Sequence, residues 1–516
     1  MSQSAWPILT ILIFFPVAAC LVLPFIKGDR AVRVFSLIVG LIECALAWPL
    51  FSFDLANGGY QFQEKIPWVA EWGLSYHLGM DGISLLMVLL TIMLIPLCVL
   101  CSWTYIGKRV KEFHFSLLLM ASACIGVFVA LDFVLFYIFW EAMLVPMFLL
   151  IAVWGGPDRR YASLKFFIYT LAGSTLLLVA MVAFYKEGGT FSIPELSAKN
   201  FSFEFQQWTF LAMAFAFAIK VPMFPFHTWL PAAHVEAPTA GSVVLASVLL
   251  KMGAYGFLRF CLPMTPDASA YFAPMMIAIS IASILYGGFV ALGQKDMKKL
   301  IAYSSVAHMG FVTLGIFIFS LRGFEGALMV MLNHGITTGG LFMLVGAIYE
   351  RSHSREISAN LGLGKYLPAY MFFFGLFALS SLGFPGTNSF VGEALVLIGV
   401  FAANPWIGFA IIPGVMLSAA YMLRLGQKLA WGEPATAKGW KDLNTREWFY
   451  FAPLAALVIY IGLAPTLTLR AMDPTLNRVL SEVGGRTKLA APAQPKLDLA
   501  AFLGAAQRPQ SEGAGR

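Results

Sequence analysis

The chain has 516 residues, of which 59% are apolar and 12% are charged, and its formal net charge is +7. A soluble domain usually has about 25% charged residues, so the composition excludes a soluble enzyme and indicates a protein embedded in a lipid bilayer. A nucleic-acid-binding role would require a basic face on a soluble segment, and the sequence offers none. We therefore expect the lipid bilayer, and no nucleic acid, as a partner.

Apolar runs of about 20 residues, each long enough to cross a hydrocarbon core about 30 Å thick, recur from end to end. They are too long for barrel strands, and a backbone in lipid must satisfy its own hydrogen bonds, so the predicted fold class is an all-α polytopic membrane protein. The first run is predicted to be a retained span, because MSQSAWP lacks the basic segment of a signal peptide. Fourteen runs begin near residues 6, 31, 82, 113, 132, 164, 208, 239, 269, 300, 324, 368, 403 and 447.

Cationic residues gather in the loops on one side of the predicted bundle. The loops after spans 1, 3, 5, 9, 11 and 13 contain 19 Lys and Arg residues, whereas the opposite loops contain four. By the positive-inside rule the first side is cytoplasmic, so both termini are predicted to lie on the periplasmic side of a bacterial inner membrane. The 19 residues are Lys27, Arg30, Arg33, Lys108, Arg109, Lys111, Arg159, Arg160, Lys165, Lys295, Lys298, Lys299, Arg351, Arg355, Lys365, Lys428, Lys438, Lys441 and Arg446, and the four are Lys65, Lys186, Lys199 and Arg322.

Few ionisable residues lie deep inside the predicted spans. A charge near the bilayer centre costs about 2.5 to 3.5 kcal/mol on insertion scales, so such residues indicate a functional site. Histidines at this depth add groups that gain or lose a proton near neutral pH. The candidates are Glu141, Lys220, Lys251, Glu393, His308 and His334.

Each candidate also has a purely structural interpretation. Glu141 and Lys220 could form a static buried ion pair that sets the helix register. Lys251 could extend its side chain to the membrane surface, but about ten to twelve residues separate it from either end of its span, which is too far at 1.5 Å per residue. His308 and His334 could equally be core histidines with satisfied hydrogen bonds.

Two prolines are predicted to break spans. Pro222 follows Lys220 by two residues in the seventh span, and Pro385 stands in GFPGTNS in the twelfth. Proline removes a backbone hydrogen bond and clashes with the preceding turn. Freed backbone groups at membrane depth are tolerated only where they line a buried or watery cavity, so each break predicts polar space beside the candidate residues. Paired breaks are typical of inverted repeats.

This pattern predicts five regions along the chain. A helical N-terminal part precedes two inverted five-helix repeats, and a last span precedes a C-terminal extension rich in Ala, Pro and Gly, which we expect to be partly disordered. The predicted boundaries are 1–110, 111–262, 263–432, 433–471 and 472–516.

Several other residues are weaker candidates. His227 and His234 flank the first break and are expected to anchor the connecting segment near the cytoplasmic side, with a relay role as the alternative. Lys165 is interpreted as an interfacial anchor or a relay accessory. Cys98 and Cys101 form a C-x-x-C inside an apolar span with no second pair, which favours buried structural thiols over a metal site.

Four segments resemble the antiporter-like membrane subunits of proton-pumping NADH:quinone oxidoreductase, respiratory complex I. They are FWEAMLVPMFLLIAVWG, KVPMFPFHTWLPAAHVEAPTAGSVVLASVLLKMGAYG, KKLIAYSSVAHMG and NHGITTGGLF, and the resemblance extends over essentially all fourteen predicted spans. Within that family, Glu393 stands where the sister subunits usually have lysine, and the tail is too short for the long lateral helix of one of them. Both features favour the member with an acid at this position.

The resemblance implies roles for the candidate residues. Glu141 and Lys220 resemble the family's charged pair on the fifth and seventh spans, Lys251 its central lysine, and Glu393 its terminal channel acid. His308 and His334 resemble polar links between them. A nearby carboxylate would hold Lys220 protonated, and weakening that pair would let the lysine pass its proton toward Lys251.

The resemblance also implies that this chain is a proton-translocating subunit without a redox centre or metal of its own. FMN, iron–sulfur clusters and quinone would then lie in partner subunits, and two sister antiporter-like subunits would flank this chain. Subunits of multisubunit sodium/proton antiporters and membrane-bound hydrogenases share much of the pattern and remain alternatives. A membrane enzyme holding haem or quinone is a third alternative, in which His308 and His334 would face each other.

Overall fold

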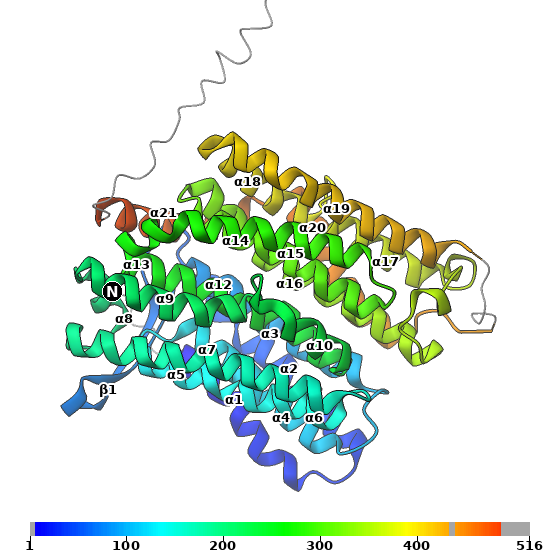
Figure 1. Ribbon diagram of the computed structural model, residues 1–516. Helices are drawn as coiled ribbons and strands as arrows, with labels where there is room; N and C mark the ends of the chain where they lie inside the picture. Colours follow the sequence, from blue (N-terminus) through cyan, green and yellow to red (C-terminus); the bar gives the residue numbers. More distant parts are fainter. Residues whose placement is uncertain (1–5, 433–438, 487–516) are drawn as a thin grey trace, which may run out of the picture.

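The computed structural model describes residues 6–432 and 439–486. Figure 1 shows most of its helices side by side along one common direction, as expected for membrane spans. The α-helices are α1 (Ile8–Val22), α2 (Asp29–Leu46), α3 (Gly82–Ser102), α4 (Val110–Val129), α5 (Phe133–Ala142), α6 (Leu144–Trp154), α7 (Arg159–Gly188), α8 (Ile193–Ala198), α9 (Phe203–Lys220), α10 (Trp229–Glu236), α11 (Thr239–Val244), α12 (Leu250–Gly256), α13 (Leu262–Met264), α14 (Pro266–Leu292), α15 (Met297–Phe317), α16 (Leu321–Ser352), α17 (Pro368–Ser381), α18 (Asn388–Ala403), α19 (Pro405–Ala430), α20 (Thr445–Leu463) and α21 (Thr466–Arg486).

The predicted helical membrane fold is confirmed. Within the described residues, 12 helices are long and apolar enough to cross a membrane. They correspond to all the predicted spans except the seventh and the twelfth, which are the two predicted to break. The total of fourteen spans stays a prediction.

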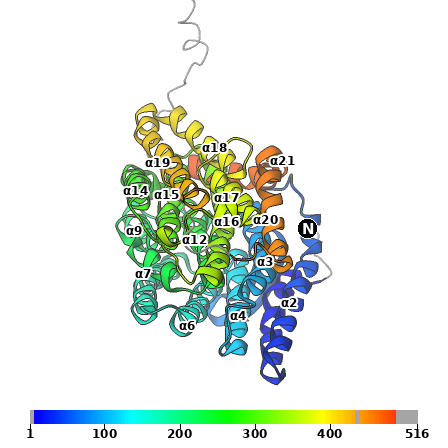
Figure 2. The ribbon, with the colours of Figure 1, turned by 90° about the vertical axis from the view of Figure 1, so that its right-hand side faces the viewer.

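Three of these spans form the interior of the bundle. All side chains in the apolar windows of Thr239–Met264 and Leu321–Ser352 are buried, as are 94% of those in Met297–Phe317. Figure 2, viewed along the bundle, shows α12 and α16 surrounded by other helices. Polar side chains on these interior helices therefore contact protein and not lipid.

The loop between the second and third spans contains a β-hairpin that the sequence analysis did not predict. β1 (Gln61–Val69) pairs antiparallel with β2 (Leu74–Met80), with Gln61 opposite Met80 and Ile66 opposite Tyr76. β2 is largely buried because it packs under the start of α5, where the Leu131 backbone N–H donates to the carbonyl of His77.

The first part of the predicted C-terminal extension is helical in the structure. Residues 472–486 belong to α21, whose apolar side chains repeat at helical spacing and are buried. Met472, Leu476, Val479 and Val483 form this face. Burial of that face explains why the helix forms despite its low overall hydropathy. Residues 487–516, the rest of the predicted extension, lie outside the described residues.

Contacts between the cation-rich loops place them at one end of the bundle, which we call the basic end. Arg33 donates a 2.8 Å hydrogen bond to the carbonyl of Ile106, and the Trp154 indole N–H donates one of 2.8 Å to the carbonyl of Lys108. These bonds join the loops after the first, third and fifth spans.

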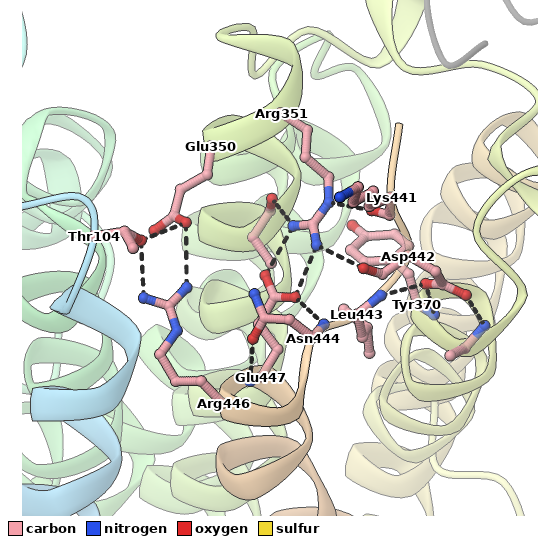
Figure 3. Close-up of polar contacts among 12 residues, drawn as sticks. Thr104, Glu350, Arg351, Tyr370, Lys441, Asp442, Leu443, Asn444, Arg446 and Glu447 are labelled. Atoms are coloured by element: carbon pink, nitrogen blue, oxygen red, sulfur yellow. Dashed lines mark hydrogen bonds and ion pairs between the residues drawn. The ribbon is translucent and has the colours of Figure 1, made fainter. Parts of the chain in front are cut away.

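The other three cation-rich loops join the same end. Thr104, after the third span, donates a 2.7 Å hydrogen bond to Glu350 and accepts one of 2.8 Å from Arg446 (Figure 3). An ion pair between Asp296 and Arg355, with an N–O distance of 3.5 Å, adds the loop after the ninth span.

A second ion pair ties the start of α20 to the end of α16. Arg351 contacts Glu447 with an N–O distance of 2.7 Å, and both side chains are largely buried. Asp442 accepts hydrogen bonds from the backbone N–H groups of Ala369 and Tyr370, which begin α17 (Figure 3). The basic end is therefore closed by a connected polar network and not by isolated surface charges.

Lys298, which the sequence analysis counts among the residues of the cation-rich loops, is buried inside the protein. It lies in the first turn of α15, buried, and donates to the carbonyl of Ala237 at 2.7 Å and to the hydroxyl of Ser242 at 3.3 Å. The lysine therefore satisfies a carbonyl just past the end of α10.

Candidate functional site

The first predicted break is present. α9 ends at Lys220, and the chain resumes as a helix only at α10. The carbonyls around the break find partners inside the protein: Ala218 accepts from the N–H of Met223 at 2.9 Å, and Ile219 accepts from the indole of Trp229 at 2.9 Å. The break is therefore a satisfied feature of the fold, as non-helical backbone at membrane depth must be.

Lys220 is 2% exposed, and the groups that contact its ammonium are polarisable but uncharged. Its Nζ lies 3.6 Å from the sulfur of Met143 and 4.9 Å from the centre of the Trp140 ring. A cation over an aromatic face is stabilised by the ring quadrupole, although less than by a carboxylate in contact.

Glu141 stands in the sequence between the two residues that touch Lys220, yet it forms no ion pair with it. Among the described residues, no N–O distance within 4.0 Å joins Glu141 to Lys220. Glu141 Oε1 is buried without a hydrogen-bond partner. Since α5 ends at Ala142 and α6 begins at Leu144, the carboxylate lies beside another interruption. The static ion pair is thus not formed in this structure.

Lys251 lies on α12, which is flanked by π-helical segments, Leu245–Leu249 and Phe257–Cys261. A π segment widens the helix and frees carbonyls from their usual partners. Lys251 is 0% exposed, and its Nζ donates to the carbonyl of Ala246 and lies 2.7 Å from Nδ1 of His334.

α12 packs closely against the first break at Gly253. A Cβ added at Gly253 would lie 2.6 Å from the Val221 side chain and 2.7 Å from the carbonyl of Phe217. This close approach brings the helix of Lys251 against the end of the helix of Lys220. Among the described residues, no polar side chain forms a hydrogen bond that bridges the two lysines.

From Lys251 a line of ionisable groups continues to Glu393. The rings of His334 and His308 lie edge to face with centroids 5.6 Å apart. His308 Nε2 donates to the carbonyl of Ser381 at 3.0 Å and lies 3.7 Å from Glu393 Oε1. The four residues come from α12, α16, α15 and α18, so the line crosses the bundle from helix to helix.

The second predicted break is also present. α17 ends at Ser381 and α18 begins at Asn388, and the segment between them has Gly383 and Gly386 at positive φ, +74° and +91°. A Cβ at Gly383 would lie 2.6 Å from Glu393 Oε2, so this glycine makes room for the acid.

A cavity of about 10 Å³, enough for about one water molecule, lies beside this break. Polar groups surround it: Ser380 donates to the Asn388 side chain at 2.6 Å and shares a 2.7 Å hydrogen bond with Thr337. The cavity lining consists of His308, Val330, His334, Thr337, Thr338, Ser381, Ser389 and Glu393. Sequence reasoning missed these residues, although the density of Ser, Thr and Asn around Pro385 in LSSLGFPGTNS is a usable signal for those in the segment 379–389.

The weaker candidates lie off this line. His227 and His234 are buried, and none of their ring nitrogens has a hydrogen-bond partner. The His234 ring stacks on Phe342 with centroids 4.5 Å apart. Lys165 lies near the start of α7 and donates to the hydroxyl of Tyr161 at 3.1 Å.

The cysteines and acids do not assemble a metal site within the described residues, where no cluster of three His, Cys, Asp or Glu side chains could hold an ion. Cys98 and Cys101 are buried free thiols on α3.

The chain is similar in sequence and in fold to several known proteins. Residues 130–419 match the family described as NADH:quinone oxidoreductase/Mrp antiporter, TM. The chain is 46% identical to NADH-quinone oxidoreductase subunit M of Rhodobacter capsulatus over 92% of its length and 96% of the relative's. It is 45% identical to NADH-ubiquinone oxidoreductase chain 4 of Prototheca wickerhamii over 77% of both chains. Its fold matches a chain of respiratory complex I from Thermus thermophilus with bound NADH, at TM-score 0.86 and 32% identity over 92% of this chain and 100% of that one.

Proposed function

Because this chain belongs to the subunit M family of NADH-quinone oxidoreductase, we propose that it carries protons through the membrane part of that complex, driven by electron transfer in other subunits. The observation that carries the proposal is the line Lys251, His334, His308 and Glu393, buried in the middle of the bundle with a 2.7 Å contact at one end and a 3.7 Å contact at the other.

Each group on this line can both accept and release a proton. Lys251 donates to His334 Nδ1 when charged, and the unpartnered His334 Nε2 is then free to pass a proton on. His308 stands between that ring and Glu393, next to the water-sized cavity. A water there would complete the path, since protons move along hydrogen-bonded groups and water.

The first break supplies the controlling charge. Lys220, with only a thioether and an aromatic ring in contact, depends on the distance to Glu141 for its charge. Approach of the carboxylate would hold the lysine protonated, and its withdrawal would favour release toward Lys251. The interruption between α5 and α6 is the place where Glu141 can move.

The direction of transport follows from the cation distribution. The basic end would face the cytoplasm, and both described chain ends would face the periplasm of a bacterial inner membrane. The two inverted five-helix repeats would span 111–262 and 263–432, so that the first holds Lys220 and Lys251 and the second holds Glu393. His227, His234 and Lys165 would then lie toward the entry side.

The redox chemistry would take place in partner subunits. They would hold FMN, iron–sulfur clusters and quinone, and sister antiporter-like subunits would flank this chain on both sides. Purification in mild detergent tests this assignment. Flavin and iron–sulfur subunits should co-purify, whereas only small membrane proteins would indicate a self-sufficient sodium/proton antiporter.

Replacing Lys251 with arginine tests the relay. Arginine keeps the charge but cannot lose its proton in a protein, so Lys251→Arg should abolish most pumping. The measurement is pumped protons per NADH in vesicles holding the intact complex. Lys186→Arg, at an exposed site near the end of α7, is the matched control and should pump normally. Normal pumping by Lys251→Arg would remove Lys251 from the relay.

A further inference from the structure

Polar side chains continue from Lys251 in a second direction, toward the end opposite the basic end. Tyr255 and Arg259 follow Lys251 at intervals of four residues, which places the three on one helix face. Tyr255 is 0% exposed and accepts a 3.1 Å hydrogen bond from Arg259 Nε. Hence a ladder of polar groups leads from the central lysine toward the outer end of the bundle.

Arg259 is only 4% exposed, and each nitrogen of its guanidinium has a partner inside the protein. Its guanidinium forms an ion pair with Asp81 at 2.7 Å and donates to Tyr60 at 2.9 Å and to Ser84 at 3.3 Å. Removing one partner of such a buried pair is strongly destabilising in other proteins, because it leaves an uncompensated buried charge. The arginine is therefore fixed in place.

A second arginine completes the cluster from α21. Arg478 lies 3.4 Å from Asp81 and 3.8 Å from Glu482, which is partly exposed. The Tyr60 ring lies near both guanidiniums, 5.1 Å from that of Arg259 and 4.7 Å from that of Arg478. Asp81 also accepts from the N–H of Ser84 as the N-cap of α3. Asp81, the buried acid of this cluster, thus contacts both arginines and the first turn of α3.

We propose that Arg259, held by Asp81, Tyr60 and Arg478, is an electrostatic plug that closes the outer end of the first repeat. A guanidinium cannot release its proton, and its fixed charge repels a proton that approaches along Tyr255. With this end closed, a proton on Lys251 is directed through His334 toward Glu393. This inference rests on the proposed relay, and it gives the relay its direction.

The competing role is a mechanical clamp, since the same contacts fasten α3, the end of the eighth span and α21 together. A clamp and a plug differ in what happens to passive proton flow. Loss of a clamp lowers the amount of assembled complex without opening a path. Loss of a plug lets a proton gradient decay through complexes that are still intact.

The test uses Arg259→Gln in the whole complex, reconstituted in vesicles without NADH. We expect an imposed pH gradient to decay about tenfold faster per complex, the factor that corresponds to a barrier lowered by 1.4 kcal/mol. NADH oxidation should continue while pumped protons per NADH fall. Arg259→Lys keeps a positive charge but can release its proton, so its vesicles should leak less than those of Arg259→Gln and more than those of the unchanged complex. An unchanged decay rate in intact Arg259→Gln complexes overturns the proposal.

A matched control and a second variant separate the outcomes. Arg446→Gln removes an arginine that pairs with Glu350 at the basic end, away from the ladder, and should cause no leak. If Arg259→Gln does not assemble, Arg478→Gln leaves the Arg259–Asp81 pair in place and should give a smaller leak; tight vesicles with this variant overturn the plug. If the proposed relay itself is wrong, Lys251→Arg will pump normally. That result is distinct from the outcomes that test the plug.

Discussion

The two helix breaks differ in what surrounds the charged residue. At the first, Lys220 touches a thioether and an aromatic ring, and the neighbouring carboxylate of Glu141 has no partner on Oε1. At the second, Glu393 faces His308 across 3.7 Å, and hydroxyl, imidazole and carboxylate groups line a water-sized cavity. The same kind of backbone break therefore lies in two different environments: in one, a lysine has only a thioether and an aromatic ring in contact, and in the other, an acid faces a histidine beside a polar cavity.

The largest expected effect comes from removing a charge at the first break. Lys220→Ala and Glu141→Gln should each reduce pumped protons per NADH to about a tenth or less, because in the proposed relay these two charges at the first break control proton release toward Lys251. Vesicles holding equal amounts of complex provide the measurement. Lys186→Ala, at an exposed lysine, should pump normally. Normal redox-driven pumping by either first-break variant would show that its residue is not part of the relay.

At the second break, Glu393→Gln should also block pumping, whereas Glu393→Asp should retain part of it. The carboxyl group is the only proton carrier in contact range of His308 on that side among the described residues. Glu393→Lys tests whether the residue typical of the sister subunits can replace the acid. Protons per NADH are compared with complex content on a native gel. An acid that only binds the next subunit would give less complex but unchanged stoichiometry.

A smaller effect should follow from Gly383→Ala. The added Cβ would meet Glu393 Oε2 at 2.6 Å and displace the carboxylate, so pumping should fall several-fold. Gly386→Ala is a matched control: its φ is also positive, but nothing lies within 4 Å of the added Cβ. Both variants carry a similar backbone strain of about 1 to 2 kcal/mol. Equal pumping by the two would mean that strain, and not the contact with Glu393, sets the result.

The smallest effect is expected from Trp140→Phe beside Lys220. The change weakens a cation–π contact, worth about 0.5 to 2 kcal/mol, and removes the hydrogen bond from the indole to Ser174. Pumping should fall less than about threefold, since a ring remains. Trp208→Phe, at an exposed site on α9, should have no effect. A loss as large as that of Lys220→Ala would mean that the indole itself belongs to the path.

Local patterns in the sequence were sufficient to predict the membrane-spanning helices and the two helix breaks. Hydropathy over about 20 residues identifies a span without knowledge of its neighbours. Pro222 and Pro385 act on their own helix, so both interruptions could be predicted. α21 was missed because its mean hydropathy is low and its buried stripe is narrow, and the hairpin because Gln61–Val69 is only partly buried.

The contacts between helices could not be derived in the same way. Lys251 and His334 are 83 residues apart, and their 2.7 Å contact depends on the rotation of two buried helices. The absence of a Glu141–Lys220 ion pair depends on side-chain conformation, which residue type does not determine. Arg259 carried a usable signal, its spacing from Tyr255 and Lys251, but its partner Asp81 lies on a different span.

The polar network of the basic end also constrains how the chain is made. Thr104 and Arg446 are bonded across 342 residues, and Arg351 finds Glu447 only at the start of α20. During synthesis, Glu350 and Arg351 reach the membrane surface well before these partners leave the ribosome. Until α20 is inserted, that end has unpaired charges and an open loop. Insertion of α20 therefore completes a polar surface that the earlier helices begin. Chains truncated before α20 should be cleaved by proteases at the basic end.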